Sequence, residues 1–185
     1  KWLGENKGKI NLANAGLGAA SHLCGLLFQQ SLQIDMTTVP YKGTAPAMTD
    51  LLGGQVDIMC DQTTNTTQQI EGGKVKAFAV TTLKPLTTPA LAKLPTLDAS
   101  GLKGFNVSIW HALYAPKGTP KAAQDKVNAA LRNALKDPEF IKRQEALGAV
   151  VITDNRLNPA DHKKFVEAEI AKWGPAIKAA GQYAD

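Results

Sequence analysis

A short glycine-containing stretch, Asn14 to His22, has the residue types of an anion-binding turn. A β-rich segment, 10–13, precedes it and an apolar-periodic segment, 23–28, follows it, so Gly16 and Gly18 fall on a predicted strand-to-helix turn. Glycine allows positive φ and close approach of a ligand to the backbone, and the first amides of a helix have no intrahelical acceptor. We therefore expect this turn to hold an anion at the positive end of the helix dipole.

Two other interpretations of this turn stay open from the residues alone. A G-x-G pair without the third glycine of a dinucleotide fingerprint is a weak signal, so a purely structural turn is one alternative. Ser21 and His22 have the residue types of a nucleophile and its base. Adjacent residues on a helix point about 100° apart, however, so we predict no catalytic dyad.

Two further candidate side chains follow predicted strands. Tyr41 comes directly after the β-rich segment 36–40, and Asp61 directly after 56–60. Parallel sheets bind ligands beyond the carboxyl ends of their strands, which places both residues near the glycine turn. Tyr41 lines the ligand site or only its own turn. Asp61 either caps the following Thr-rich helix or binds an ammonium, hydroxyl or water of the ligand.

The chain has two cysteines, Cys24 and Cys60, whose spacing excludes a CxxC metal or redox site. If the helix and strand that carry them are neighbours, the thiols could form a disulfide in an oxidising compartment. Such a bond would stabilise the fold by about 3 to 4 kcal/mol in the chain-entropy model. Two buried free thiols are the alternative. The sequence predicts no metal site and no cofactor.

Composition and charge limit the function classes further. With 185 residues, 44% hydrophobic and 20% charged, the chain is typical of a globular protein. No apolar run approaches the roughly 20 residues of a membrane span, so we expect no membrane insertion. The 21 basic and 16 acidic residues give a net charge of +5. The basic residues are scattered rather than clustered, which disfavours nucleic acid as a partner, but a positive background favours an acidic small ligand.

The chain divides into two regions with different patterns. Residues 1–105 alternate predicted strands (9–13, 36–40, 56–60 and 74–82) with helices, which predicts an α/β unit with a mainly parallel sheet. Residues 106–185 supply the end of a long predicted strand, 105–115, and one short strand, 150–152. The rest is helical, and the last helix is expected to end at Gly181. These helices have no sheet of their own to cover, so we expect them to belong to another lobe.

Several motifs, in order along the chain, carry a family likeness. Together they are similar to the extracytoplasmic solute receptors of tripartite tricarboxylate transporters, the Bug family. The motifs are Gly16-x-Gly18-x-x-Ser21-His22-Leu23, Val39-Pro40-Tyr41-Lys42-Gly43-Thr44-x-Pro46-Ala47, Asp50-Leu51-Leu52-Gly53-Gly54-Gln55-Val56-Asp57, Ala79-Val80-Thr81, Leu94-Pro95-Thr96, Ala115-Pro116-x-Gly118-Thr119-Pro120 and Trp173-x-x-x-Ile177-Lys178-Ala179-Ala180-Gly181.

The resemblance implies a two-lobed periplasmic receptor, similar to type II periplasmic binding proteins, that closes on a small organic anion and presents it to a membrane permease. It implies a carboxylate held by backbone amides and small hydroxyl side chains, and Asp61 facing the cleft. Carried over by position, the ligand-binding residues of the turn are Asn14, Ala15, Gly16, Gly18, Ala19 and Ser21. Residues 1–105 correspond to the second lobe, and 106–185 to a crossover strand and a tail returning to a first lobe that the chain lacks.

Two departures from the family pattern bear on function. Family members often carry hydroxyl residues where this chain has Ala15, Ala19 and Ala20, so backbone amides and Ser21 must supply more of the contacts. Without the first lobe, we expect weak binding by this polypeptide alone and self-association through the exposed tail. The alternatives are the effector-binding domain of a transcription regulator and a nucleotide-dependent enzyme.

Overall fold

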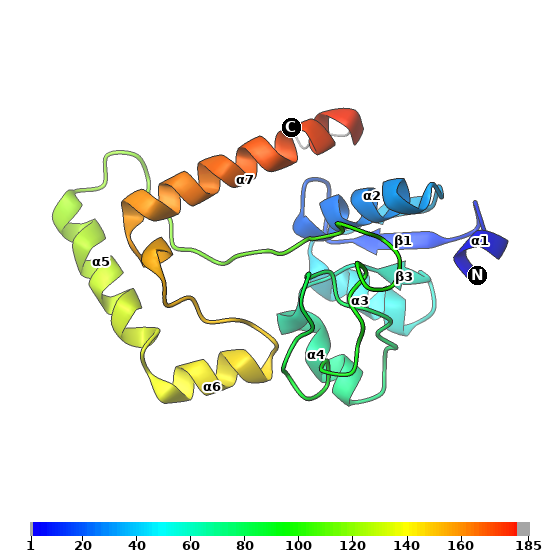
Figure 1. Ribbon diagram of the computed structural model, residues 1–185, viewed down its shortest axis with the longest axis horizontal. Helices are drawn as coiled ribbons and strands as arrows, with labels where there is room; N and C mark the ends of the chain where they lie inside the picture. The colour runs from blue at the N-terminus through cyan, green and yellow to red at the C-terminus, as the bar shows by residue number, and fades with distance from the viewer. Residues whose placement is uncertain (1, 181–185) are drawn as a thin grey trace.

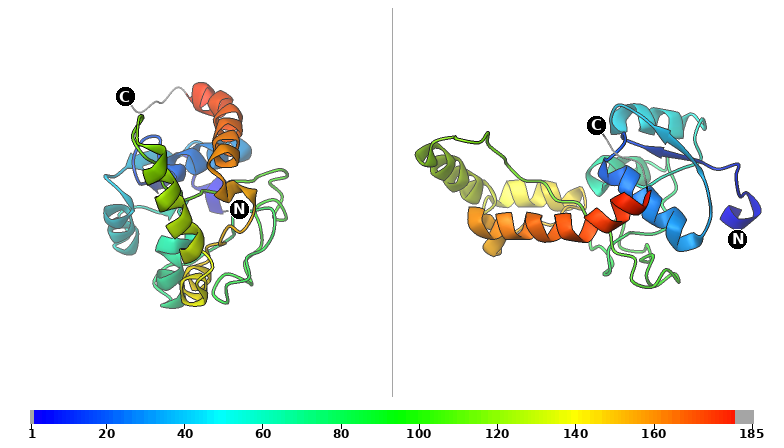
Figure 2. Two further views of the ribbon diagram at one scale, coloured as in Figure 1. Left: turned by 90° about the vertical axis from the view of Figure 1, so that its left-hand side faces the viewer. Right: turned by 90° about the horizontal axis from the view of Figure 1, so that it is seen from above.

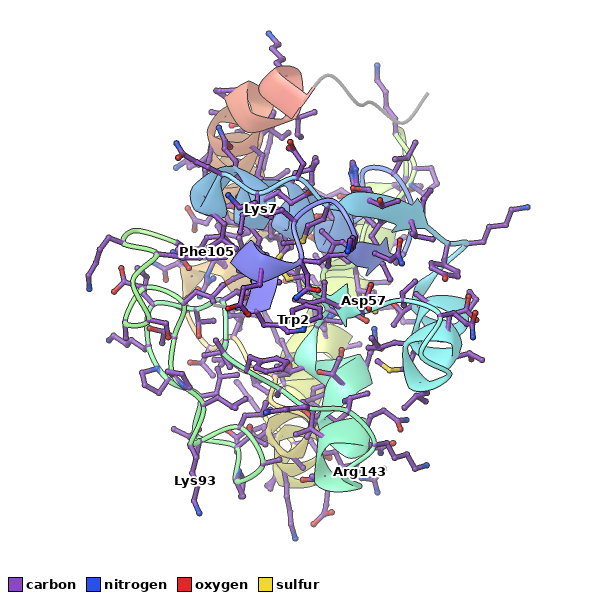
Figure 3. The ribbon with its side chains drawn as sticks, turned by 90° about the vertical axis from the view of Figure 1, so that its right-hand side faces the viewer. Trp2, Lys7, Asp57, Lys93, Phe105 and Arg143 are labelled. Carbon is purple, nitrogen blue, oxygen red and sulfur yellow. A yellow bond between two sulfur atoms is a disulfide. The ribbon has the colours of Figure 1, made fainter. Side chains whose placement is uncertain are left out.

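The computed structural model describes residues 2–180, and a three-stranded parallel sheet lies at its centre (Figure 1). The strands are β1 (Asn11–Asn14), β2 (Thr37–Pro40) and β3 (Ile58–Met59), in the order β2-β1-β3. Both pairings are parallel, with Leu12 opposite Thr38 on one side and opposite Ile58 on the other. Asp57, labelled in Figure 3, extends the β1–β3 pairing because its amide and carboxylate both bond to the backbone of Asn11. The predicted α/β fold is confirmed.

Helices α2 (Ala20–Leu32), α3 (Thr44–Leu52) and α4 (Thr63–Glu71) follow the three strands in turn, and a short α1 (Trp2–Glu5) precedes them. The alternation of side chains along β1 assigns its two faces. Leu12 packs in a cluster with Ile10 and with residues of α2, whereas Ala13 packs with Ala47 of α3. One helix therefore covers each face of β1, as expected for right-handed crossovers in a parallel sheet.

Three predicted strands are absent from the described residues. The segment 74–82 contributes only an isolated parallel bridge, between Val80 and Thr96. In the segment 105–115, the Val107 amide donates to the Thr81 carbonyl, and the Thr81 hydroxyl donates to the Val107 carbonyl. The segment 150–152 forms no strand. An extended, β-rich segment becomes a strand only when a partner strand is present, and residues 2–180 offer none there.

Beyond residue 108 the chain forms a helical tail that extends away from the sheet (Figures 1 and 2). Its elements are α5 (Lys121–Ala134), α6 (Pro138–Ala146), a 3-10 turn (Asn155–Leu157) and α7 (Pro159–Ala180). The predicted end at Gly181 lies outside the described residues. Asp137 caps α6 by accepting hydrogen bonds from the amides of Glu139 and Phe140. Within residues 2–180, no helix is long and apolar enough to cross a membrane.

Two sets of contacts hold the tail on the α/β unit. The side chain of Trp173 on α7 packs against a buried cluster that includes Cys24, Phe105 and Val107. The threonines at 63, 67 and 88 donate hydrogen bonds to the carbonyls of Gly148, Leu147 and Glu145. Helices α5 and α6 contain no buried residue. The tail is therefore attached at the end of α6 and near the end of α7, and α5 and α6 add no buried core of their own.

Candidate functional site

The glycine stretch forms the predicted turn between β1 and α2. Both glycines adopt positive φ, +123° at Gly16 and +77° at Gly18, where side-chain-bearing residues are strained. A Cβ at Gly16 would lie 3.0 Å from the carbonyl oxygen of Tyr41, because the neighbouring β2 turn passes close by. Position 16 therefore requires glycine for two reasons: the positive φ, and the lack of space for a Cβ.

Side chains within the turn bond to several of its own amides. The amide of Ala15 donates to Ser21 Oγ at 2.9 Å, that of Gly16 to Asn14 Oδ1 at 2.9 Å, and that of Gly18 to His22 Nδ1 at 3.2 Å. The Ala19 amide donates to the Gly16 carbonyl. These four amides, which the sequence predicts to contact a ligand, fix the shape of the turn in this structure, and their contact with a ligand stays a prediction.

Three other amides at the start of α2 remain available. The amides of Leu17, Ala20 and Ser21 have no hydrogen-bond acceptor within the described part of the chain. Leu17 is 47% exposed and Gly18 and Ala20 are exposed, whereas Ser21 is 5% exposed; no side chain caps the helix at Ala19. The positive end of the α2 dipole is therefore open to solvent, which is the condition for binding an anion.

Asn14 adds a buried donor at the same edge of the sheet. Its side chain is 1% exposed, and its Nδ2 has no hydrogen-bond partner among the described residues, while its Oδ1 accepts from Gly16. By strand alternation it lies on the α2 face of β1, like Leu12. A buried amide nitrogen without a partner is costly, and a ligand oxygen would satisfy it.

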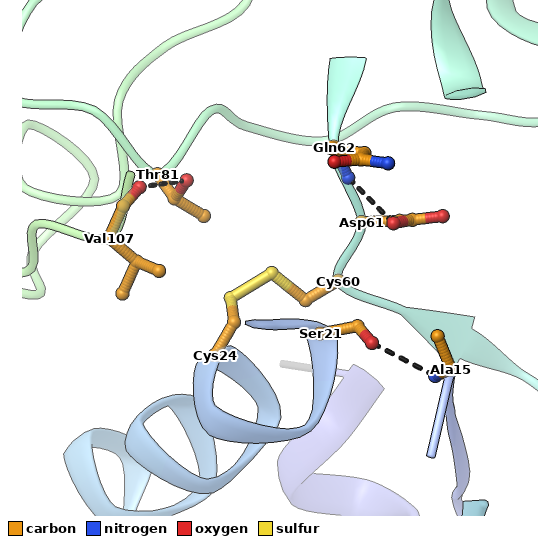
Figure 4. Close-up of a disulfide and its surroundings, with 8 residues drawn as sticks. All are labelled: Ala15, Ser21, Cys24, Cys60, Asp61, Gln62, Thr81 and Val107. Carbon is orange, nitrogen blue, oxygen red and sulfur yellow. Dashed lines mark hydrogen bonds between the residues drawn. A yellow bond between two sulfur atoms is a disulfide. The ribbon is translucent and has the colours of Figure 1, made fainter. Parts of the chain in front are cut away.

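Asp61 follows β3, and its carboxylate also has an unpaired oxygen (Figure 4). Oδ1 accepts from the Gln62 amide at 2.8 Å, whereas buried Oδ2 has no hydrogen-bond partner within the described chain. Burial raises the pKa of Asp61. The Gln62 amide opposes this rise, as do the polar side chains of Asn65 and Thr44, which lie near the carboxylate but outside hydrogen-bond geometry. Helix α4 has Gln62 at its N-cap without a side-chain cap bond, so Asp61 does not act as an ordinary helix cap.

Tyr41 contributes its backbone to the site more than its side chain. Its amide donates to the Asn14 carbonyl, and its own carbonyl borders Gly16. The hydroxyl donates to Asp50 Oδ2 on α3 at 2.7 Å, and this bond holds the pKa of Tyr41 above its usual 10.0. The phenol is thus engaged with α3 in this structure.

The two cysteines are bonded in the structure, with their Cα atoms 6.1 Å apart. The bond joins α2, one turn beyond Ser21, to the residue immediately before Asp61 (Figure 4). No group of three or more His, Cys, Asp or Glu side chains in residues 2–180 has an arrangement that could hold a metal ion.

One contributor was missed from the sequence. From the sequence, His22 was considered as a possible partner of Ser21; in the structure it is 2% exposed, and its Nδ1 accepts a hydrogen bond from the Gly18 amide. The i, i+4 spacing of Gly18 and His22 across a helix start is the signal that could have indicated this bond. Ser21 and His22 each bond to a turn amide, Ala15 and Gly18 respectively, and the pair forms no dyad.

Comparisons with known proteins assign the family. The chain matches the model of the tripartite tricarboxylate transporter family receptor over residues 2–182. It is 46% identical over 178 residues to the UPF0065 protein in the TAR-I ttuE-ttuC' intergenic region of Agrobacterium vitis. That match covers 96% of this chain and 51% of the relative. The chain therefore spans about half the length of that curated relative.

Solved structures give the same result. The periplasmic binding protein BugD is 54% identical with a TM-score of 0.91, covering 100% of this chain and 60% of BugD. MatC from Rhodopseudomonas palustris with bound malate is 36% identical with a TM-score of 0.88, covering 95% of this chain and 59% of MatC. The match to a family of extracytoplasmic solute receptors excludes the enzyme alternative and confirms the predicted periplasmic location. This chain belongs to the receptor family of the tripartite tricarboxylate transporters.

Proposed function

We propose that this chain supplies one lobe and the returning tail of a receptor that captures a small organic carboxylate for a tripartite tricarboxylate-type transporter. Family membership and the malate bound by MatC support the ligand class. The membrane permease is the partner that the family implies. The effector domain of a transcription regulator is the less favoured alternative, because the matched family consists of transport receptors.

The observation that carries this proposal is the open start of α2. The unpaired amides of Leu17, Ala20 and Ser21 lie at the positive end of the helix, beside the buried and unpaired Nδ2 of Asn14. A carboxylate has two oxygens with about four lone-pair sites and can accept from several such donors at once. The bonds within the turn hold these donors in place before the ligand arrives, which lowers the entropy cost of binding.

Asp61 is the polar group on the other side of the same sheet edge. An unpaired carboxylate oxygen repels a second carboxylate but accepts a hydrogen bond from a hydroxyl or ammonium. We propose that Asp61 accepts a hydrogen bond from a hydroxyl or ammonium of the ligand, while the ligand's carboxylate binds at the start of α2. Tyr41 contributes to the site through its backbone and through its bond to Asp50.

This chain alone should bind weakly. A helix-terminus contact contributes about 0.3 to 1 kcal/mol when exposed and up to about 2 kcal/mol when sheltered. Micromolar affinity requires about 8 kcal/mol, and two-lobed receptors reach it by closing both lobes around the ligand. Millimolar binding to the isolated chain is the expected result.

The helical tail is the second part of the proposal. Large apolar side chains are exposed along it, including Leu113 at 62%, Val150 at 75% and Ile170 at 67%. We assign residues 1–105 to the second lobe and 106–185 to a tail that packs on the other lobe in the complete receptor. The isolated chain should then self-associate, which sedimentation velocity over a concentration series would detect.

The test is a titration followed by amide resonances, which detects millimolar affinity. Adding malate to the ¹⁵N-labelled chain at constant ionic strength should shift the amides of Leu17, Ala20 and Ser21 with one saturating dissociation constant. Dimethyl malate, which lacks the charges, serves as the control and should leave these resonances in place. The expected dissociation constant is about 1 mM. If malate at about 50 times that concentration shifts no resonance of the turn, the receptor site is not at this turn.

A further inference from the structure

The segment Cys60 to Gln62, which carries Asp61, is weakly tied to the rest of the candidate site. Strand β3 has only two residues, and its last register pair joins Met59 to Ala13. Beyond that pair, no hydrogen bond in residues 2–180 connects Cys60, Asp61 or Gln62 to the glycine turn or to α2. Backbone pairing therefore ends two residues before the carboxylate.

The Cys24–Cys60 disulfide crosses this gap. It joins the residue immediately before Asp61 to α2, three residues beyond Ser21, and the Cα atoms are 6.1 Å apart. Figure 4 shows the Ser21–Ala15 bond, the disulfide and the Asp61–Gln62 bond side by side. Cys24 is 2% exposed and lies in the cluster formed with Phe105 and Val107.

The two ends of this bond are held differently. On the α2 side, Ser21 and His22 bond to turn amides, and the Ala15 carbonyl accepts from Gly43, so the turn keeps its shape without the disulfide. On the other side, α4 is bonded through Thr63 and Thr67 to Gly148 and Leu147, in the segment that follows α6. Breaking the disulfide should therefore move Asp61 rather than the turn.

We propose that the Cys24–Cys60 disulfide is a positioning element of the ligand site, which holds Asp61 in register with the anion-binding start of α2. The inference rests on the proposed function. In an oxidising compartment the bond keeps both halves of the site together, and in its absence the carboxylate-binding half works alone.

The test compares the oxidised chain with the C24S/C60S double variant in the malate titration. In the oxidised chain, malate should shift the Gln62 amide together with the turn amides of Leu17, Ala20 and Ser21. In the variant, the turn amides should still shift, with a dissociation constant within about threefold, while the shift at Gln62 disappears. A ¹³C titration of Asp61 Cγ provides a second readout, and its pKa should return toward the ordinary aspartate value because the carboxylate gains solvent.

The matched control is F105L, which removes packing from the same buried cluster but leaves the disulfide intact. It should unfold at lower urea concentration, yet keep the Gln62 shift and the raised pKa of Asp61. If C24S/C60S retains both of these readouts, or if F105L loses them equally, the disulfide has no positioning role. Should C24S/C60S fail to fold, C24A/C60V preserves apolar packing, and tris(2-carboxyethyl)phosphine reduction of the native chain gives the same comparison.

The outcomes separate this inference from the function on which it rests. No malate-induced shift at the turn in the oxidised chain would refute the receptor site itself. A shift at the turn without one at Gln62 in that same sample would leave the anion site intact and overturn only the coupling to Asp61.

Discussion

The α/β unit and the helical tail of this chain are stabilised in different ways. Every described side chain that is buried lies between Ile10 and Val107, and none lies in the described residues from 108 onward. The tail is nonetheless regular, with α7 running over 22 residues. Helices as short as α5 and α6, with 14 and 9 residues, are marginal in water without tertiary packing, and neither contains a buried residue.

This difference follows from where the sheet lies. In the first region α2 and α3 each cover one face of β1. Within the described part of the chain the tail helices cover no sheet, and α5 exposes Val127 at 52%. One region therefore buries a core of its own, whereas the described part of the tail buries none.

The largest expected effect comes from a pair of leucine truncations, one in each region. Leu12 is 3% exposed in the core of the sheet, whereas Leu113 is 62% exposed. L12A should lower the free energy of unfolding by about 2 to 5 kcal/mol, because it leaves a cavity. L113A should change it by no more than about 0.5 kcal/mol. Urea unfolding followed by circular dichroism measures both, and equal losses would show that the tail has a core of its own.

A pair of glycine substitutions sharpens the same comparison at the site. Gly16 and Gly118 both have positive φ, +123° and +89°, but only at Gly16 would a Cβ meet another atom within 4 Å. G118A should cost about 1 to 3 kcal/mol from backbone strain alone. G16A should cost at least as much and also abolish the malate shift at the turn. The idea fails if G118A weakens malate binding as strongly as G16A does.

The sequence was most informative where a local pattern determines the structure. The glycines at 16 and 18 predicted the turn between β1 and α2, and the alternation of strands with helices over residues 1–105 predicted the parallel sheet. The strands expected at 74–82 and 105–115 were wrong, because a strand depends on a distant partner that no local pattern reveals. For the same reason, sequence could place Asn14 in the turn but could not show that its Nδ2 lacks a partner.

Sequence analysis also could not predict that side chains near the turn accept hydrogen bonds from the amides of the turn. The side chains of Ser21 and His22 occupy the amides of Ala15 and Gly18, and this depends on rotamers set by packing. The amides left available, at Leu17, Ala20 and Ser21, are only partly the residues that the family resemblance implied. Whether these residues contact a ligand stays a prediction.

Asp61 offers a smaller effect, which depends on pH. Its pKa is raised in the folded chain by burial, so the folded state binds a proton more tightly than the unfolded state does. Its contribution to stability is therefore complete below the ordinary pKa of 3.8 and is lost as pH rises through the folded value. D61N should raise the free energy of unfolding at pH 7 by about 1 kcal/mol, since no charge is buried. Urea midpoints at pH 7 and pH 3 should show this gain at the higher pH only.

Asp154 in the tail should behave in the opposite way, with the smallest effect. It is exposed, and hydrogen bonds from the side chain and the amide of Arg156 lower its pKa to about 2. Its contribution is thus present above the ordinary 3.8 and is lost as pH falls through about 2. Because an exposed ion pair is screened by water and salt, D154N should barely move the urea midpoint at pH 7.

A ¹³C titration of both carboxyls tests the contrast directly: the Asp61 resonance should titrate above 3.8 and that of Asp154 below it. If Asp61 also titrated low, its carboxylate would have found a partner in solution, and the buried, unpaired oxygen on which its proposed role depends would be lost.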